Sequence, residues 1–133
     1  MTSPSLTSPT KDLLSTSSNL YRAKDYVISL RQKLTIQGQD YSFSLRYVPD
    51  KLMLDQSGVA SYLDQILSEQ EQAPESLAHH ILENIMDQII PKWIEINLCQ
   101  HKNEYDQRII ITLEDRQPHW DAPPLLNRLP KLD

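Results

Sequence analysis

Cysteine and histidine are scarce in this chain of 133 residues. It has one cysteine, Cys99, and four histidines. A single cysteine excludes an internal disulfide framework, and no cysteines and histidines have the spacing that builds a zinc site. We therefore expect no metal site and a reducing, cytoplasmic setting.

Basic residues are also few, and they are scattered along the sequence. Thirteen Lys and Arg stand against 18 Asp and Glu, which gives a formal net charge of -5. A protein that binds the phosphates of nucleic acid needs a clustered basic surface. The composition therefore argues against nucleic acid as a partner.

Long apolar runs are absent as well. No stretch approaches the roughly 18 apolar residues of a membrane span. The N-terminus lacks the basic and apolar regions of a secretory signal. These absences predict a cytoplasmic protein with no membrane partner.

Two segments lack a helix or strand period. Residues 1–18 contain ten Ser or Thr and two Pro, with little apolar surface to offset the entropy of ordering them. We therefore predict a disordered arm over residues 1–20. Residues 117–133 carry four of the nine prolines and predict a proline-rich C-terminal arm, either packed through Trp120 and Leu125 or free. The folded domain is expected over residues 21–116.

Four segments between the arms alternate apolar and polar residues with period two, which is the signature of half-buried strands. Their apolar positions are Tyr26, Ile28, Leu30, Leu34 and Ile36; Tyr41, Phe43, Leu45 and Tyr47; Ile94, Ile96 and Leu98; and Ile109, Ile111 and Leu113. The sequence QGQD joins the first two strands as a hairpin turn, because Gly38 tolerates a positive φ. Residues 101–107 form the loop of a second hairpin.

Two segments between these hairpins have helical spacing instead. One is a short helix that begins near Ser57 and ends in a polar run, with apolar positions Val59, Tyr62, Leu63, Ile66 and Leu67. The other is a stronger helix from Pro74 or Glu75 to about Ile90, where Pro91 ends it. Its apolar stripe is Leu77, Ile81, Ile85 and Ile89.

The predicted order is therefore strand, strand, helix, helix, strand, strand. Two hairpins with a helical pair between them predict an α+β protein, a four-stranded antiparallel sheet with two helices on one face. Sheet edges are templates for pairing with another copy, so we expect a homo-oligomer that forms through them.

This ββααββ order is that of the tunnelling fold, whose subunits join their sheets into a barrel and bind purine-like or pterin-like heterocycles at subunit junctions. The segment LRYVPDKLMLDQSGVASYL is more specific. It resembles the NADPH-dependent 7-cyano-7-deazaguanine reductases, the nitrile reductases of queuosine biosynthesis, from Tyr47 to Met53 and at the pair Tyr62 and Leu63. The resemblance covers roughly residues 25–115.

A second match lies after the stronger predicted helix, where PKWIEI resembles the family's third-strand start. An alignment without gaps, counted back from Pro91, matches Glu75 to the glutamate at the start of the family's helix. In the family, that glutamate binds the heterocycle. A carboxylate accepts two parallel N–H bonds from the amide-plus-amino edge of guanine or pterin. The resemblance therefore implies that Glu75 binds the substrate, although Pro74 stands where the family has a histidine.

The residues alone leave other roles open for these positions. An acid in the first turn of a helix is favoured by the helix macrodipole, so Glu75 can be purely structural. His79 lies four residues later on the same helix face, where it can pair with Glu75, contact a ligand or be solvated. We take Glu75 and His79 as the candidate substrate-binding residues.

The family's catalytic cysteine, whose thiolate adds to the nitrile and forms a thioimide, is missing. The gapless match puts Gln32 at its position, and a glutamine amide cannot replace a thiolate. Cys99 does not correspond to this nucleophile and reads most simply as a small buried hydrophobe. The family's cofactor-associated ESKS stretch reads DQSG at residues 55–58. NADPH is thus implied by the resemblance alone, and the sequence identifies no catalytic residue.

Three functions follow from these observations. The first, which we favour, is a tunnelling-fold protein that binds a purine-, deazaguanine- or pterin-like heterocycle at a subunit interface, with Glu75 as the anchor. The second is a non-catalytic oligomeric interaction module, or a divergent NADPH-dependent reductase of the queuosine pathway that acts with an active partner. The third is an unrelated small α+β domain whose likeness is accidental.

Overall fold

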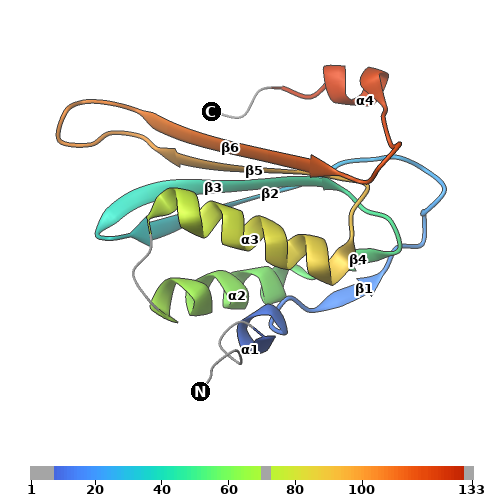
Figure 1. Ribbon diagram of the computed structural model, residues 1–133, viewed down its shortest axis with the longest axis horizontal. Coiled ribbons are helices and arrows are strands. Elements are labelled where there is room, and N and C mark those ends of the chain that lie inside the picture. Colours follow the sequence, from blue (N-terminus) through green and yellow to red (C-terminus); the bar gives the residue numbers. More distant parts are fainter. Residues whose placement is uncertain (1–7, 70–72, 131–133) are drawn as a thin grey trace.

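The computed structural model describes residues 8–69 and 73–130 of the chain (Figure 1). Its four long strands form one antiparallel sheet in the order β2-β3-β5-β6. Their bounds are β2 Ile28–Ile36, β3 Gln39–Val48, β5 Trp93–Gln100 and β6 Ile109–Arg116. Both predicted hairpins belong to one sheet, which confirms the predicted α+β fold. Residues 1–7 and 131–133, the outer parts of the two predicted arms, lie outside the described residues.

Two helices cover one face of this sheet (Figure 1). They are α2 Gln56–Glu69 and α3 Pro74–Ile89. The core between sheet and helices contains Phe43, Leu45, Ile94, Ile96 and Leu98 from the strands and Tyr62, Leu63, Leu77, Ile81 and Ile85 from the helices. Burying each side chain of this kind contributes about 1.5–3 kcal/mol, so the stripes read from the sequence are the main source of stability.

The opposite face of the sheet, here called the far face, carries the alternate residues of the same strands. On β2, β3 and β5 these residues are Arg31, Lys33, Ser42, Ser44, Arg46, Glu95, Asn97 and Cys99. Most of them are polar or charged. The sheet therefore has one apolar face under the helices and one polar face turned away from them.

The hairpin between β2 and β3 turns on two residues. Gln37 has a φ of 52° and Gly38 a φ of 78°. Two successive positive φ values are those of a type I′ turn, whose twist matches that of the flanking strands. The turn fixes the pairing of Ile36 with Gln39 and, through it, the register of the whole hairpin.

The ends of α3 are set by local chemistry. Pro74 stands at the start of the helix, where its missing N–H costs nothing, and Glu75 follows in the first turn. At the other end Ile90 adopts a left-handed conformation, and its N–H donates to the Met86 carbonyl at 3.1 Å. The first turn of α3 lies at the end of the sheet that carries the β2–β3 turn (Figure 1).

The N-terminal segment is ordered, which corrects the prediction of a disordered arm for residues 8–20. It forms α1 Ser8–Lys11 and β1 Thr16–Ser18, and β1 pairs with β4 Leu52–Leu54 in a small second sheet. Leu14 is fully buried against the core. A Cβ on Gly58 would clash with the Ser15 hydroxyl oxygen, so the segment packs directly on α2. Few apolar residues suffice here because the folded domain already provides the surface against which they pack.

The C-terminal segment crosses to the other side of the sheet. It contains a short helix, α4 Pro123–Asn127, which the sequence did not predict and which lies opposite α2 and α3 (Figure 1). Beyond α4, the carbonyl of Pro130 accepts a hydrogen bond of 2.6 Å from Arg46 Nη1. Arg46 is 6% exposed and also donates to the Glu95 carboxylate. This segment therefore packs on the far face.

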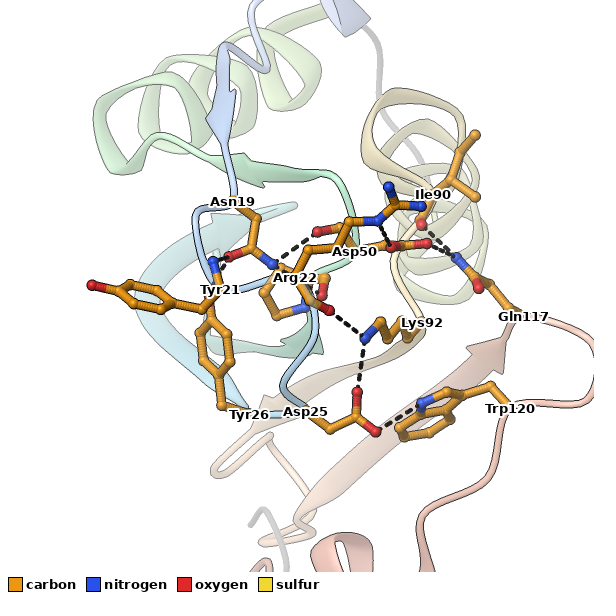
Figure 2. Close-up of polar contacts among 11 residues, drawn as sticks. Asn19, Tyr21, Arg22, Asp25, Tyr26, Asp50, Ile90, Lys92, Gln117 and Trp120 are labelled. Carbon is orange, nitrogen blue, oxygen red and sulfur yellow. Dashed lines mark hydrogen bonds and ion pairs between the residues drawn. The ribbon is translucent and has the colours of Figure 1, made fainter.

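A polar network holds the two terminal segments together at one end of the sheet (Figure 2). Asp50, at the turn after β3, accepts from Arg22 Nε and from Gln117 Nε2, both at 2.9 Å. Lys92 Nζ donates to the Arg22 carbonyl at 2.9 Å and to Asp25 at 2.8 Å. The aspartate of the PDKLM sequence is thus the centre of a structural network.

We expect this network to make stability depend on pH through Asp50. The hydrogen bond from Gln117, followed by the bond and charge of Arg22, lowers the pKa of the Asp50 carboxyl. Its contribution is therefore present above the unfolded value near 3.9 and is lost as the pH falls through the lower folded pKa. Asp50→Asn should cost about 1 kcal/mol at pH 7, and the difference from the wild type should shrink below about pH 4.

Urea unfolding of both proteins between pH 7 and pH 2 measures this difference. Asp64→Asn, a change at an exposed acid on α2, is the matched control and should leave the curve unaltered. A difference in unfolding free energy between the wild type and Asp50→Asn that stays constant over the whole range would contradict the role given to the Asp50 charge.

Candidate functional site

Glu75 lies in the first turn of α3 with its side chain exposed. Within the described residues its carboxylate makes no hydrogen bond and no ion pair, and Ala73 before the helix has no side chain that can cap it. The free N–H groups of the first turn favour a negative charge there. The helix therefore fixes the backbone at Glu75, while the carboxylate oxygens remain available.

Tyr41, at the start of β3, lies near Glu75. Burial raises the pKa of the Tyr41 hydroxyl, and the negative charge of Glu75 raises it further. The hydroxyl is therefore a neutral donor at physiological pH. Tyr41 is 7% exposed and also lines an open pocket of about 610 Å³ at this end of the sheet. Glu75 and this pocket thus share one neighbour.

His79 does not pair with the Glu75 carboxylate. Its Nδ1 lies 2.8 Å from the backbone carbonyl of Glu75, one turn back on the helix. A carbonyl only accepts, so Nδ1 carries a proton, and the Nε2 atom of the neutral ring is left as an acceptor. The ring is exposed, and the bond holds it beside the same first turn as the carboxylate.

Gln32 and Cys99 lie on opposite faces of the sheet. Gln32 pairs with Phe43, a core residue under the helices, whereas Cys99 pairs with Ser42 on the far face. Cys99 is 1% exposed. The single thiol is therefore separated by the sheet from the face on which α3 and Glu75 lie.

The segment that resembles the family's cofactor-associated stretch is covered by the chain itself. The Asp55 N–H donates to the Ser15 carbonyl at 3.0 Å, and the Ser17 hydroxyl donates to the Asp55 carboxylate at 3.2 Å. Gly58 packs against Ser15. Residues 55–58 contain no cation, and a carboxylate is their only charge. They do not fit the phosphates of NADPH.

One contact at the Tyr41 end of the sheet joins two residues that sequence reasoning did not connect. The Ser42 hydroxyl oxygen lies 3.0 Å from His101 Nε2, although the two residues are 59 positions apart. His101 directly follows β5, and its Nδ1 lies 4.0 Å from the Cys99 sulfur. The strand alternation places Ser42 and Cys99 on one face, but only the register of β3 with β5 makes them neighbours.

Two classes of site lack support among residues 8–69 and 73–130. In these ranges no three His, Cys, Asp or Glu side chains are grouped as metal ligands. None of the helices there combines the length and the apolar character that crossing a membrane requires.

Comparisons with known proteins connect this geometry to one solved fold. No family profile and no curated protein matches the chain. Among solved structures, the archaeosine synthase QueF-Like in its apo form is similar with a TM-score of 0.55 and 15% identity, over 68% of this chain and 91% of that one. At this identity the likeness shows a shared fold. The chain is therefore an α+β protein with the ββααββ tunnelling fold.

Proposed function

We propose that this protein binds a purine-, deazaguanine- or pterin-like heterocycle, with Glu75 as the residue that recognises it. The observation that carries the proposal is the Glu75 carboxylate itself, which is exposed, carried by the first turn of a helix and without a polar partner in the described residues. Two carboxylate oxygens match the adjacent N–H donors of an amide-plus-amino edge.

Tyr41 and His79 support this assignment. The neutral Tyr41 hydroxyl can donate to a carbonyl oxygen of the heterocycle, and His79 Nε2 can accept an N–H. Together the three residues offer both acceptors and a donor within one region, and a guanine-like edge carries both donors and an acceptor. The imidazole and the phenol are positioned by α3 and β3, which are packed on the same core.

We place this site at a junction between two copies of the chain. Within the described residues, no strand pairs with the outer edge of β2 or β6, and α3 packs against β5 and β6. The β6 edge exposes Ile109 and Ile110. Pairing β2 of one copy with β6 of the next would put new side chains beside α3.

The proposed activity is binding without thioimide chemistry. Gln32 stands at the position of the family's nucleophile, and Cys99 lies buried behind the sheet. Residues 55–58 do not fit NADPH, as described above. We therefore propose a binding role, either alone or beside a catalytically active partner, rather than nitrile reduction by the isolated chain.

Glu75→Gln tests the proposal. Gln keeps one acceptor oxygen but presents an N–H₂ group to a ligand donor, and the charge-assisted bonds are lost. We expect the affinity for the bound heterocycle to fall roughly 10- to 150-fold, because hydrogen bonds to charged groups contribute about 1.5–3 kcal/mol. Titration calorimetry and native mass spectrometry with guanine, 7-deazaguanine and pterin measure affinity and the number of copies together.

Glu83→Gln is the matched control, because Glu83 is an exposed acid on the same helix, about two turns later. It should leave binding unchanged. The helix start should lose only about 0.3–1 kcal/mol in Glu75→Gln, so both variants should stay folded. If no heterocycle of the panel binds the wild type, or if Glu75→Gln binds as the wild type does, the proposal is wrong.

A further inference from the structure

The pocket beside Tyr41 concentrates positive charge in a chain whose formal net charge is -5. Lys33, His101 and Lys102 line it together with the hydroxyl groups of Thr35 and Ser42, and Asp40 supplies its only carboxylate. An adjoining pocket of about 340 Å³ shares Lys33, Ser42 and His101 and adds Arg31. The two pockets are therefore lined by three cationic side chains, Arg31, Lys33 and Lys102, and by one acidic side chain, Asp40.

Most of the positive charge of this region is not neutralised by the protein itself. Within the described residues, the side chains of Arg31 and Lys33 make no ion pair and no hydrogen bond, although both are exposed on the far face. Lys102 pairs with Asp106 at 3.2 Å, but both side chains are more than three-quarters exposed. An ion pair so open to water is weak. All three charges are available to a ligand.

The strand register places these groups together. Lys33 lies directly opposite Ser42, and Arg31 lies opposite Ser44. Directly opposed side chains on one face of an antiparallel pair are about 4.5–5.5 Å apart at Cβ. Ser42 in turn contacts His101 Nε2 at 3.0 Å. The arrangement thus joins cations from β2 with hydroxyl and imidazole groups from β3 and the end of β5.

Ser42 and His101 together can donate to an anion. In the tautomer that carries its hydrogen on Nε2, Nε2–H donates to the Ser42 oxygen, and the hydroxyl hydrogen is then free for a ligand oxygen. A tetrahedral dianion offers several acceptor oxygens, each of which can take one of these donors. Cationic side chains and a hydroxyl are donors that match phosphate well.

We infer that this pocket binds a phosphate group, either free phosphate or the phosphate of an organic monoester. The inference does not depend on Glu75 or on the heterocycle, because it rests on Arg31, Lys33, Ser42 and His101. A simpler role exists for basic residues on β2, since lysine on an edge strand discourages pairing between sheets. That role needs no hydroxyl or imidazole partner and predicts no anion affinity.

The experiment titrates the full chain with inorganic phosphate, guanosine 5′-monophosphate and guanosine, followed by calorimetry and phosphorus NMR. The wild type should bind inorganic phosphate, and raised salt should weaken this binding. Lys33→Gln should reduce the affinity about tenfold, since it removes one of the three cations that attract the dianion. Lys24→Gln, a change at an exposed lysine outside the pocket, should have no effect.

The outcomes separate the sources of the anion and the two proposals. Binding of inorganic phosphate alone supports the inference with the free anion as ligand, and binding of the monophosphate as well supports it with a monoester. Phosphate binding that survives Glu75→Gln, with no affinity for guanosine, would uphold this inference while the heterocycle proposal fails. No phosphate binding, or equal affinity in wild type and Lys33→Gln, would overturn it.

Discussion

Leu14→Ala should lower the free energy of unfolding by about 3 kcal/mol, within the range measured when a buried leucine is cut to alanine. Leu14 is fully buried, and it follows α1 in a stretch that is otherwise rich in Ser and Thr. Its carbonyl accepts a 3.2 Å hydrogen bond from the Gln88 side chain on α3. The truncation leaves a cavity between the N-terminal segment and both helices, which the rigid helices cannot close.

Leu13→Ala is the matched control for this change. Leu13 is the preceding residue of the same type and is 38% exposed. Its truncation should cost well under about 1 kcal/mol, as surface changes usually do. Chemical denaturation followed by tryptophan fluorescence measures both variants. Equal and small effects at the two positions would mean that the N-terminal segment is not part of the cooperatively folded unit.

Arg46→Met should have a comparable effect, about 3 kcal/mol at neutral pH, the lower end of the cost of breaking a buried ion pair. Arg46 donates to Glu95 at 2.8 Å, to the Pro130 carbonyl at 2.6 Å, and its guanidinium carbon lies 6.0 Å from the centre of the Trp93 ring. Methionine fills most of the space but leaves the Glu95 charge, whose side chain is 18% exposed, without its partner.

The double variant Arg46→Met with Glu95→Leu separates two costs of the single change. One is the cost of leaving the Glu95 charge without a partner, and the other is the cost of losing the Arg46 hydrogen bond to Pro130. Most of the stability should return, because two well-packed apolar side chains often replace a buried pair at little cost. Lys102→Met breaks the exposed pair with Asp106 and should change stability by less than about 0.5 kcal/mol. If the hydrogen bond from Arg46 to Pro130 were the dominant contribution, stability would not recover. The double variant would then be destabilised as much as Arg46→Met alone.

The elements that sequence periodicity predicted are those whose stability comes from a long apolar face. Phe43 and Ile96 belong to strands whose alternation continues over eight or more residues, and Ile81 belongs to a stripe of four turns. Such patterns determine which face of the strand or helix is buried. Pro74, Pro91 and Gly38 then mark the boundaries, because each restricts or permits a particular backbone conformation.

The short elements were missed because they depend on contacts from elsewhere in the chain. β1 has three residues, and its pairing with β4 depends on a strand more than 30 positions away. α4 has five residues and no buried side chain. Elements of this length have no detectable period, and tertiary contacts decide their conformation. A low apolar content was therefore a poor guide to disorder between Ser8 and Leu20.

The candidate site, too, could be predicted from the sequence only in part. The sequence could place Glu75 and His79 in one turn of a helix, because both belong to a single element with a clear start. It could not show that His79 is bonded to the Glu75 carbonyl, since a carbonyl is present at every position. His101 came beside Tyr41 and Ser42 only through the register of β3 with β5, which the one-dimensional pattern leaves open.

The strand order of the sheet has a consequence for how copies of this chain can assemble. Every neighbouring pair is antiparallel and the number of strands is even, so β2 and β6 run in opposite directions. A rotation that brings β6 of one molecule beside β2 of the next continues the antiparallel order without interruption. A ring closed in this way contains a multiple of four strands, and its circumference changes in steps of about 19 Å, four spacings of about 4.8 Å. A rotation that fails to close produces a filament instead. The rotation between successive copies depends on the twist of one sheet, so this twist sets the width of any central channel.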